Sequence, residues 1–333
     1  MYILKPLSVL LVIVSFALPA QSQSSWPAKP IRLLISNSAG SAPDLVARVT
    51  TDQLGKALGQ SWIIENRPGG EGVIGAEAAA KSAPDGYTFY VASIVAVAVS
   101  PHLVKNIPYD ALRDFTPVAM IVDSGPSAIA VHPEMPVKTF PELVTLAKNQ
   151  PGKLSYSITV AFLNISQEWL NKVAGISMTQ INYKDTGQAV QDALSGRVPV
   201  MVNSIGTALP HIRAGKMRFL AVTSLKRLPM FPEVPAVAEF YPGYESEGWL
   251  SLAAPVATPV EVVNRVNREM ERIVRDAQFT QAVQKFVWAN NSGASTPQAL
   301  TAFYRAERDK WGKIIRELGI QPLGIQPLGI QPN

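Results

Sequence analysis

Cysteine is absent from this 333-residue chain, and histidine occurs only three times. The lack of cysteine excludes thiol nucleophiles and zinc–thiolate sites. His102, His132 and His211 each stand beside a proline, which predicts that each lies at a turn or at the end of an element. The chain also lacks the patterns H-E-x-x-H, G-x-S-x-G and G-x-x-x-x-G-K-[ST], which mark zinc peptidases, serine hydrolases and P-loop proteins. We therefore expect a protein that is not an enzyme and holds neither a metal ion nor a cofactor.

One glycine motif resembles a cofactor signature. Gly70-Glu-Gly72-Val-Ile-Gly75 matches G-x-G-x-x-G and follows a strand candidate. The dinucleotide fingerprint, however, normally follows the first strand, and it needs an acidic residue at the end of a strand about 20 residues on. Neither condition is met, so we interpret these glycines as shaping a strand–turn–helix connection close to a cleft.

Runs of like charge are also missing. The net charge is +5, yet lysine and arginine are scattered and no four of them occur together. A nucleic-acid-binding chain would gather them into a patch or stripe. The sequence instead predicts a mildly basic surface that attracts small anions, and no nucleic acid as partner.

Only one long apolar run occurs, at the N-terminus. It reads "LSVLLVIVSFALPA", follows the single charge of Lys5 and precedes the polar "QSQSS". At about 14 residues it is shorter than the roughly 20 that a membrane-spanning helix needs, so we prefer a signal peptide to a membrane anchor. We predict that residues 1–25 are removed after export and that the mature chain is periplasmic.

Apolar runs alternate with helical patterns from Pro30 to about Pro255, and several runs show no polar alternation. Strands of that kind are buried on both faces, and helices between them imply βαβ units with parallel sheets. The predicted class is therefore α/β. The strand candidates are residues 31–36, 61–66, 88–93, 116–122, 127–132, 154–159, 179–183, 198–204 and 218–224.

Helix starts are marked by threonine. Thr139-Phe-Pro-Glu142 and Thr258-Pro-Val-Glu261 both fit the capping box, and a further helix is expected near Thr296-Pro297. No strand candidate follows the last helices, so we expect them to pack back onto the first domain.

The chain would then cross between two domains twice, near Val122–Gly125 and near Glu247–Ala253, which makes a hinge with a cleft. The tail repeats "LGIQP" three times and is interpreted as a short duplicated extension. The predicted division is a signal peptide at 1–25, lobe 1 at 26–123 plus 249–320, lobe 2 at 124–248 and a repetitive tail at 321–333.

A series of motifs in fixed order resembles the Bug receptors, the extracytoplasmic solute-binding proteins of tripartite tricarboxylate transporters. The motifs include "KPIRLLI", "ENRPGGEGVIGAEAAA", "PDGYT", "NIPYDALRDFTPVAMI", "HPEMPVKTFPELV" and "KRLPMFPEVPAVAE". The resemblance covers about 26–320. It implies a two-lobed periplasmic binding protein of the Venus flytrap type II, each lobe a mostly parallel sheet flanked by helices. It also implies a protein that closes on a small organic carboxylate and meets membrane transporter subunits, and we expect the protein to be a monomer.

The resemblance places the ligand in the cleft, with one carboxylate held by the loop at 36–44. The usual loop resembles P-F-x-x-G-G-x-x-D, and here only Gly40 and Asp44 match. The backbone N–H groups from Ala39 to Ala42 are the expected anion donors. The predicted ligand-binding residues are Asn37, Ser38, Ala39, Gly40, Ser41, Ala42, Ser93, Thr159, Phe162, Asn164, Thr186 and Asn203.

Two departures from the family pattern concern the ligand. The segment "YSITVAFLNISQEWL" has no glycine and carries Asn164 where histidine is usual, which predicts a more apolar pocket wall. Phe162 can stack on a ligand ring or belong to the core, and the sequence does not decide between them. Asn203 stands where aspartate is usual, so a ligand ammonium loses a partner and an amino acid becomes less suitable.

Asp44 is interpreted as a tether of its own loop. Ser41-Ala-Pro-Asp44 fits S-x-x-D, which ties a loop to the start of a helix. A carboxylate in the first turn also gains from the helix dipole, whereas it would repel a ligand carboxylate. The function predicted from all this is delivery of a small carboxylate to a transporter, with a sensor of the same fold as the alternative.

Overall fold

The computed structural model describes residues 26–183 and 185–322. The predicted signal peptide, Lys184 and residues 323–333 of the predicted tail lie outside the described residues. The strands are β1 Ile31–Ile35, β2 Trp62–Asn66, β3 Thr88–Ser93, β4 Phe115–Val131, β5 Ser155–Ile158, β6 Thr179–Asn182, β7 Val200–Ser204, β8 Arg218–Val222 and β9 Glu247–Pro255. The helices are α1 Ala42–Leu58, α2 Val73–Ala80, α3 Ser100–Leu103, α4 Phe140–Asn149, α5 Ala161–Ala174, α6 Thr186–Leu194, α7 Ile205–Arg213, α8 Val260–Arg275, α9 Ala277–Gln284 and α10 Pro297–Glu317, with short turns η1 Gly70–Gly72, η2 Val95–Val99 and η3 Val237–Glu239.

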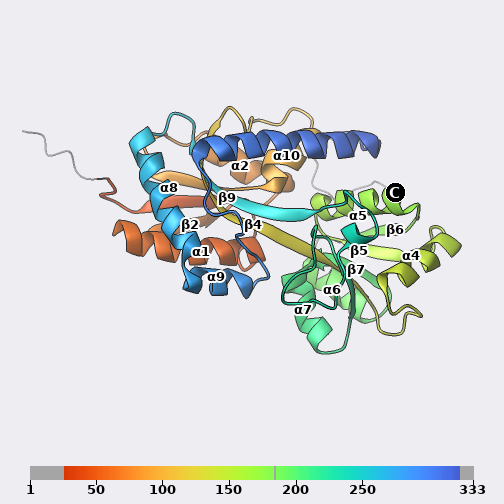
Figure 1. Cartoon of the computed structure of the whole chain (residues 1–333). Helices are drawn as coiled ribbons and strands as arrows, with labels where there is room; N and C mark the ends of the chain where they lie inside the picture. Colours follow the sequence, from red (N-terminus) through yellow and green to blue (C-terminus); the bar gives the residue numbers. More distant parts are fainter. Residues whose placement is uncertain (1–25, 184, 323–333) are drawn as a thin grey trace, which may run out of the picture.

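The strands form a nine-stranded sheet in the order β2-β1-β3-β9-β4-β7-β5-β6, and β8 also pairs with β4. β1 is parallel to β2 and β3, and β5 is parallel to β6 and β7. β4 and β9 run antiparallel to their neighbours and pass between the two parallel groups (Figure 1). The predicted α/β class with two lobes, each a mostly parallel sheet flanked by helices, is confirmed.

β4 corrects one strand prediction, because the candidates at 116–122 and 127–132 are a single strand. Ser124-Gly125-Pro126 has the composition of a turn, yet here it lies inside the strand. The pairing register shifts between Val122 and Gly125, and from Ser127 onward β4 leaves β9 and pairs with β7 and β8. Glycine and proline are tolerated at such irregularities because no regular ladder bond is required of them there.

The first parallel group is covered on both faces. Leu33 and Leu34 of β1 are both buried but belong to different clusters, since successive side chains of a strand point to opposite faces. α1, α8 and α9 pack on the face of Leu33, and α2 and α10 pack on the face of Leu34 (Figure 1). This double cover explains the absence of polar alternation in the strand sequences.

All three predicted helices are present, and two of their threonine caps are confirmed. The Thr139 hydroxyl accepts the N–H of Glu142 at 3.4 Å, and the Thr296 hydroxyl accepts the N–H of Ala299 at 3.2 Å. The capping box predicted at Thr258 is wrong, because Pro259 takes the N-cap position and the Thr258 hydroxyl donates instead to the carbonyl of Pro255 at 2.7 Å. None of the helices among the described residues combines the length and apolarity that crossing a bilayer requires.

α10 joins the two lobes. It packs on β4 and η2, and Trp311 in its second half meets α5, as the course of the helix along the upper edge of the molecule in Figure 1 allows. Trp311 is fully buried, with ring centroids 5.1 Å from Phe162 and 6.1 Å from Trp169. The apolar core therefore continues from one lobe into the other beneath this helix.

Replacing Trp311 tests this continuity. Trp311→Ala removes a fully buried indole between the lobes and should lower the free energy of unfolding by about 3–5 kcal/mol, measured by urea denaturation. Lys313→Ala changes an exposed residue of the same helix and serves as the control. An unfolding free energy that is equal in the two variants would contradict a shared core.

Candidate functional site

A cavity of about 500 Å³ lies where the two lobes meet. Its walls come from the connections at the ends of β1, β3, β5 and β7, from β4 at Gly125 and Ser127, from the start of β9, and from the segment that joins α9 to α10. Open α/β sheets bind ligands at this place, beyond the carboxyl ends of their parallel strands. The lining residues are Asn37, Ser38, Ala39, Gly40, Ser41, Ala42, Pro43, Ser93, Ile94, Val95, Gly125, Ser127, Thr159, Val160, Phe162, Leu163, Thr186, Asn203, Ser204, Thr207, Gly248, Trp249, Leu250 and Trp288.

The cavity gathers the predicted ligand-binding residues, with one exception. Asn37 to Ala42, Ser93, Thr159, Phe162, Thr186 and Asn203 all line it, and their contact with a ligand stays a prediction. Asn164 does not line the cavity. Its side-chain oxygen accepts the hydroxyl of Tyr156 at 3.0 Å, because the first turn of α5 carries this side chain toward β5 rather than toward the opening.

Helix N-termini surround the cavity. First-turn or N-cap residues of α1, α5, α6 and α7 are all among the lining residues. Each N-terminus carries a partial positive charge from the aligned peptide dipoles and from backbone N–H groups that have no partner within the helix. Four such ends around one cavity favour an anion there without any basic side chain.

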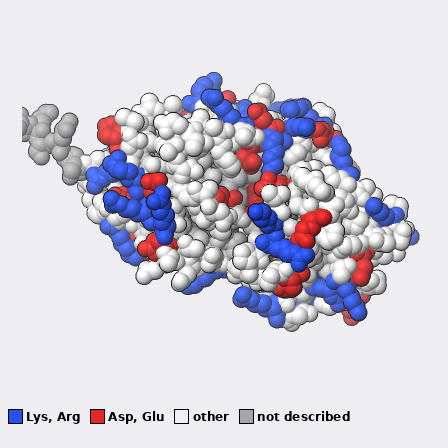
Figure 2. Space-filling model, viewed as in Figure 1, with Lys and Arg blue, Asp and Glu red and all other residues white. Residues whose placement is uncertain are grey.

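The lining side chains themselves are neutral. Among the described residues no Asp, Glu, Lys or Arg lines the cavity, and the walls carry the rings of Phe162, Trp249 and Trp288. On the molecular face shown in Figure 2, acidic and basic side chains are interspersed, without an extended area of one sign. The described residues also contain no group of three or more His, Asp or Glu side chains that could hold a metal ion.

The loop before α1 offers fewer anion donors than the sequence suggested. The N–H of Gly40 donates to Asp44 at 2.8 Å, and the N–H of Ser41 donates to the carbonyl of Ser38 at 3.2 Å. Within the described residues, the N–H groups of Ala39 and Ala42 have no acceptor. The expected row of four donors is therefore corrected to two, since a turn inside the loop engages the others.

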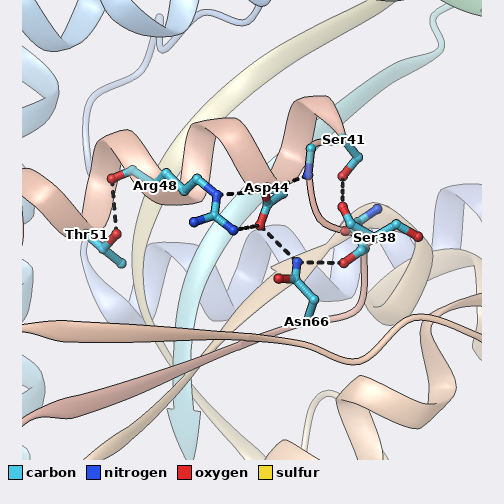
Figure 3. Close-up of polar contacts among 8 residues, drawn as sticks. Ser38, Ser41, Asp44, Arg48, Thr51 and Asn66 are labelled. Atoms are coloured by element: carbon cyan, nitrogen blue, oxygen red, sulfur yellow. Dashed lines mark hydrogen bonds and ion pairs between the residues drawn. The ribbon is translucent and has the colours of Figure 1, made fainter.

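The carboxylate of Asp44 fixes the loop before α1 through hydrogen bonds on its buried side. Its carboxylate is fully buried and accepts hydrogen bonds from the N–H of Gly40 at 2.8 Å, from Asn66 at 2.9 Å and from Arg48 at 2.9 Å (Figure 3). Burial raises the pKa of Asp44, but the hydrogen bonds from Arg48, Asn66 and Gly40 outweigh it and hold the pKa below its ordinary value. The bonded amide is that of Gly40 rather than of Ser41, whose hydroxyl donates to Ser38.

Glu71 connects the lobes beside the cavity. It lies in η1 with a left-handed φ of 53°, and its carboxylate accepts the N–H of Ala161 at 3.3 Å, at the start of α5. Val160, the N-cap of α5, provides no side-chain acceptor of its own. Burial raises the pKa of the Glu71 carboxyl, and the single backbone hydrogen bond offsets this only in part.

Several lining residues were missed. Gly125, Ser127, Gly248 and Trp249 lie where the chain was expected to cross between domains, so the predicted hinge could have indicated them. Ser204 follows Asn203 directly as the N-cap of α7, and Thr207 lies in the first turn of that helix. Nothing in the local sequence indicates Trp288, because it lies in a connection between two C-terminal helices.

Asp44 provides a test with a defined pH dependence. Asp44→Asn keeps the shape but replaces one of the two accepting oxygens with an NH2 group and removes the charge beside Arg48, and should lower the free energy of unfolding by about 1–3 kcal/mol at pH 7. Because the pKa of Asp44 is lowered by folding, its contribution is present above the ordinary value of 3.8 and is lost as the pH falls through the folded value. The difference between the proteins should therefore shrink below about pH 4, measured by urea denaturation.

Asp52→Asn is the matched control, since Asp52 lies exposed on the same helix in a pair with Lys56. This variant should unfold like the parent protein at both pH values. A loss as large as that of Asp44→Asn would show that helix charge, rather than the buried tether, accounts for the effect.

Glu71 should behave in the opposite way. Its pKa is raised by folding, so the folded state binds more protons above pH 4.5 and loses stability as the pH rises. Glu71→Gln keeps an acceptor for the Ala161 N–H without the buried charge. It should raise the melting temperature at pH 7 and leave it nearly unchanged at pH 4, with Glu77→Gln on α2 as the control. A lower melting temperature at pH 7 would contradict this balance.

Comparisons with known proteins agree with this geometry. Residues 46–320 match the model of the tripartite tricarboxylate transporter family receptor. The chain is 34% identical to a UPF0065 protein of Bordetella bronchiseptica, over 93% of this chain and 92% of that one. It is 32% identical to protein BugT of Bordetella pertussis, over 90% of this chain and 92% of that one.

A solved structure agrees as well. R. palustris Rpa4515 with adipate superposes with a TM-score of 0.81 at 30% identity, over 90% of this chain and all of that one. These relatives are binding receptors and not enzymes, which confirms the prediction made from the missing catalytic motifs. The chain therefore belongs to the family of receptors of tripartite tricarboxylate transporters.

Proposed function

We propose that this protein captures a small organic carboxylate in the cavity between its lobes and delivers it to a tripartite tricarboxylate-type transporter in the membrane. The observation that carries the proposal is the convergence of four helix N-termini on a cavity whose described lining has no charged side chain. Such a cavity holds an anion through backbone N–H groups and hydroxyls. The adipate of the R. palustris relative is an anion of this class.

The layout of the chain supports a receptor that closes on its ligand. β4 changes partners from β9 to β7 and β8 at Pro126–Ser127, which supports the division into 26–123 plus 249–320 and 124–248. A ligand that contacts both lobes stabilises their closed arrangement, and a membrane partner can distinguish it from the empty state. No feature of the described residues favours the sensor alternative.

The proposal includes the location and state of the protein. The sequence at 1–25 has the pattern of a signal peptide, and the family members are periplasmic receptors. We infer a mature periplasmic chain that acts as a monomer, while the transporter subunits supply the membrane-spanning part.

The function is tested by calorimetric titration of the purified mature chain with acetate, adipate and benzoate, and with glucose and magnesium as controls. We expect one-site saturable binding of at least one carboxylate and none of the controls. Binding of glucose or magnesium alone would overturn the proposal. Native mass spectrometry of the protein as purified supplies an independent reading, since a retained ligand should carry a carboxylate.

The anion donor at Ala42 can be removed cleanly. Ala42 is the first residue of α1, its N–H has no acceptor among the described residues, and Ser41 before it is extended, so proline fits here. Ala42→Pro should weaken carboxylate binding about 10- to 100-fold, the loss of one hydrogen bond to a charged group. Binding is measured by the same titration.

Ala277→Pro places proline at the same position of α9, which lies away from the cavity, and should bind as the parent protein does. Equal affinity of the parent and Ala42→Pro, with both folded, would show that the carboxylate does not lie at α1.

A further inference from the structure

Trp288 has a fixed place between the lobes. The residue after it, Ala289, exchanges backbone hydrogen bonds with β4: its N–H donates to Ser124 at 2.9 Å, and its carbonyl accepts the N–H of Asp123 at 3.0 Å. Trp288 itself is 8% exposed and lines the cavity. A segment from the C-terminal part of the chain thus brings an indole to the crossing point of the two lobes.

The floor under this indole is made of glycine. Gly125 and Gly248 are direct partners across the β4–β9 ladder, so the strands present no side chain there. A Cβ at Gly125 would sit 2.5 Å from Cε3 and Cη2 of Trp288, and one at Gly248 would sit 3.0 Å from Cη2. The benzo ring therefore lies directly on the two backbones. This close packing fixes the plane of the ring while the indole still lines the cavity.

Two side chains that line the same cavity have donor groups without an acceptor among the described residues. The Ser127 hydroxyl and the Asn203 amide nitrogen belong to residues that are 4% and 6% exposed, and neither donates a hydrogen bond to another described residue. The indole N–H of Trp288 likewise has no acceptor among the described residues. These three donors keep some solvent-accessible area, because the fully buried side-chain atoms without a partner among the described residues are Trp62 Nε1 and Ser157 Oγ, so acceptor atoms of a ligand in the cavity can reach them.

The rest of the wall is apolar. The other lining residues include Val160, the N-cap of α5, Phe162 and Leu163 of its first turn, and Leu250 of β9. A short hydroxylated polycarboxylate would leave much of its polar surface facing these side chains, which costs free energy. A planar ring loses little on leaving water and gains an offset or edge contact with the indole.

We propose that the ligand is a carboxylate with an aromatic ring, which lies against the indole of Trp288 while its carboxylate points to the N-terminus of α1. This inference rests on the proposed function and specifies the chemical class of its ligand. Gly125 and Gly248 matter because they let the indole lie flat at the junction, and Trp288 becomes the residue that determines specificity.

The test compares ligands matched in charge and size. Benzoate and cyclohexanecarboxylate have the same number of ring carbons and one carboxylate, and adipate adds a flexible chain. Calorimetric titration of the mature chain should show benzoate binding about tenfold more tightly than cyclohexanecarboxylate. Equal or weaker binding of benzoate would overturn the inference.

Variants assign the preference to the indole. Trp288→Leu should weaken benzoate binding about tenfold and change adipate binding little, whereas Trp288→Phe should keep most of the preference because it keeps a ring. Trp62→Leu replaces a tryptophan that does not line the cavity and is the matched control. Melting temperatures show which variants are folded. If Trp288→Leu is folded and keeps the preference for benzoate, the indole is not the platform for a ring, and the inference fails.

The two proposals fail in different ways. If the protein binds adipate but not benzoate, the proposed receptor function is supported and the proposed aromatic ligand is contradicted. Binding of no carboxylate at all sinks both.

Discussion

β4 and β9 pair antiparallel from Phe115–Pro255 to Pro126–Glu247, and this ladder carries the chain from one lobe to the other. In the order of the sheet, β9 lies next to the parallel strands of the first lobe and β4 next to those of the second, so each lobe has its own parallel group of strands. The parallel strands in both groups then direct their carboxyl ends, and the helix N-termini that follow, toward the same junction. The cavity, the glycine pair and the indole above it all depend on where this ladder runs.

The cavity is suited to bind an anion although its described lining contains no charged side chain. A buried basic side chain would have to lose its own hydration before it could bind an anion, and it would be left without a partner in the empty receptor. Backbone N–H groups at helix ends carry only partial charges, and they are held in place by the helices that they begin. Asp44 fixes the conformation of the loop before α1, because its buried, ionised carboxylate accepts hydrogen bonds from Gly40, Asn66 and Arg48.

The sequence predicted the loops of the site well and the individual atoms less well. Ser36 to Asp44 was identified as a strand–loop–helix connection because strand, small-residue turn and acidic first-turn residue follow one another in the chain. The sequence of this loop does not show that the N–H of Gly40 donates to Asp44 and the N–H of Ser41 to Ser38. These hydrogen bonds depend on how the loop folds over the buried carboxylate. Asn164 was predicted to face the cavity, but its side chain points to Tyr156 instead. The side of α5 that faces the cavity depends on how this helix packs against α10, which comes from the other end of the chain. The predicted domain division remains a prediction.

The sequence by itself determined what local order can encode: the α/β alternation, most helix starts and strands, and the motif series that identifies the family. These follow from residue periodicity, turn chemistry and the order of segments along one chain. Only the tertiary structure decided that 115–131 is one strand, that Glu71 meets Ala161, and that Trp288 lies on Gly125 and Gly248. The last two contacts join segments that are far apart in the sequence. The continuity of the strand overrides the turn that the local composition of Ser124-Gly125-Pro126 favours. Their free energy comes from packing and pairing between elements, which no short stretch of sequence contains.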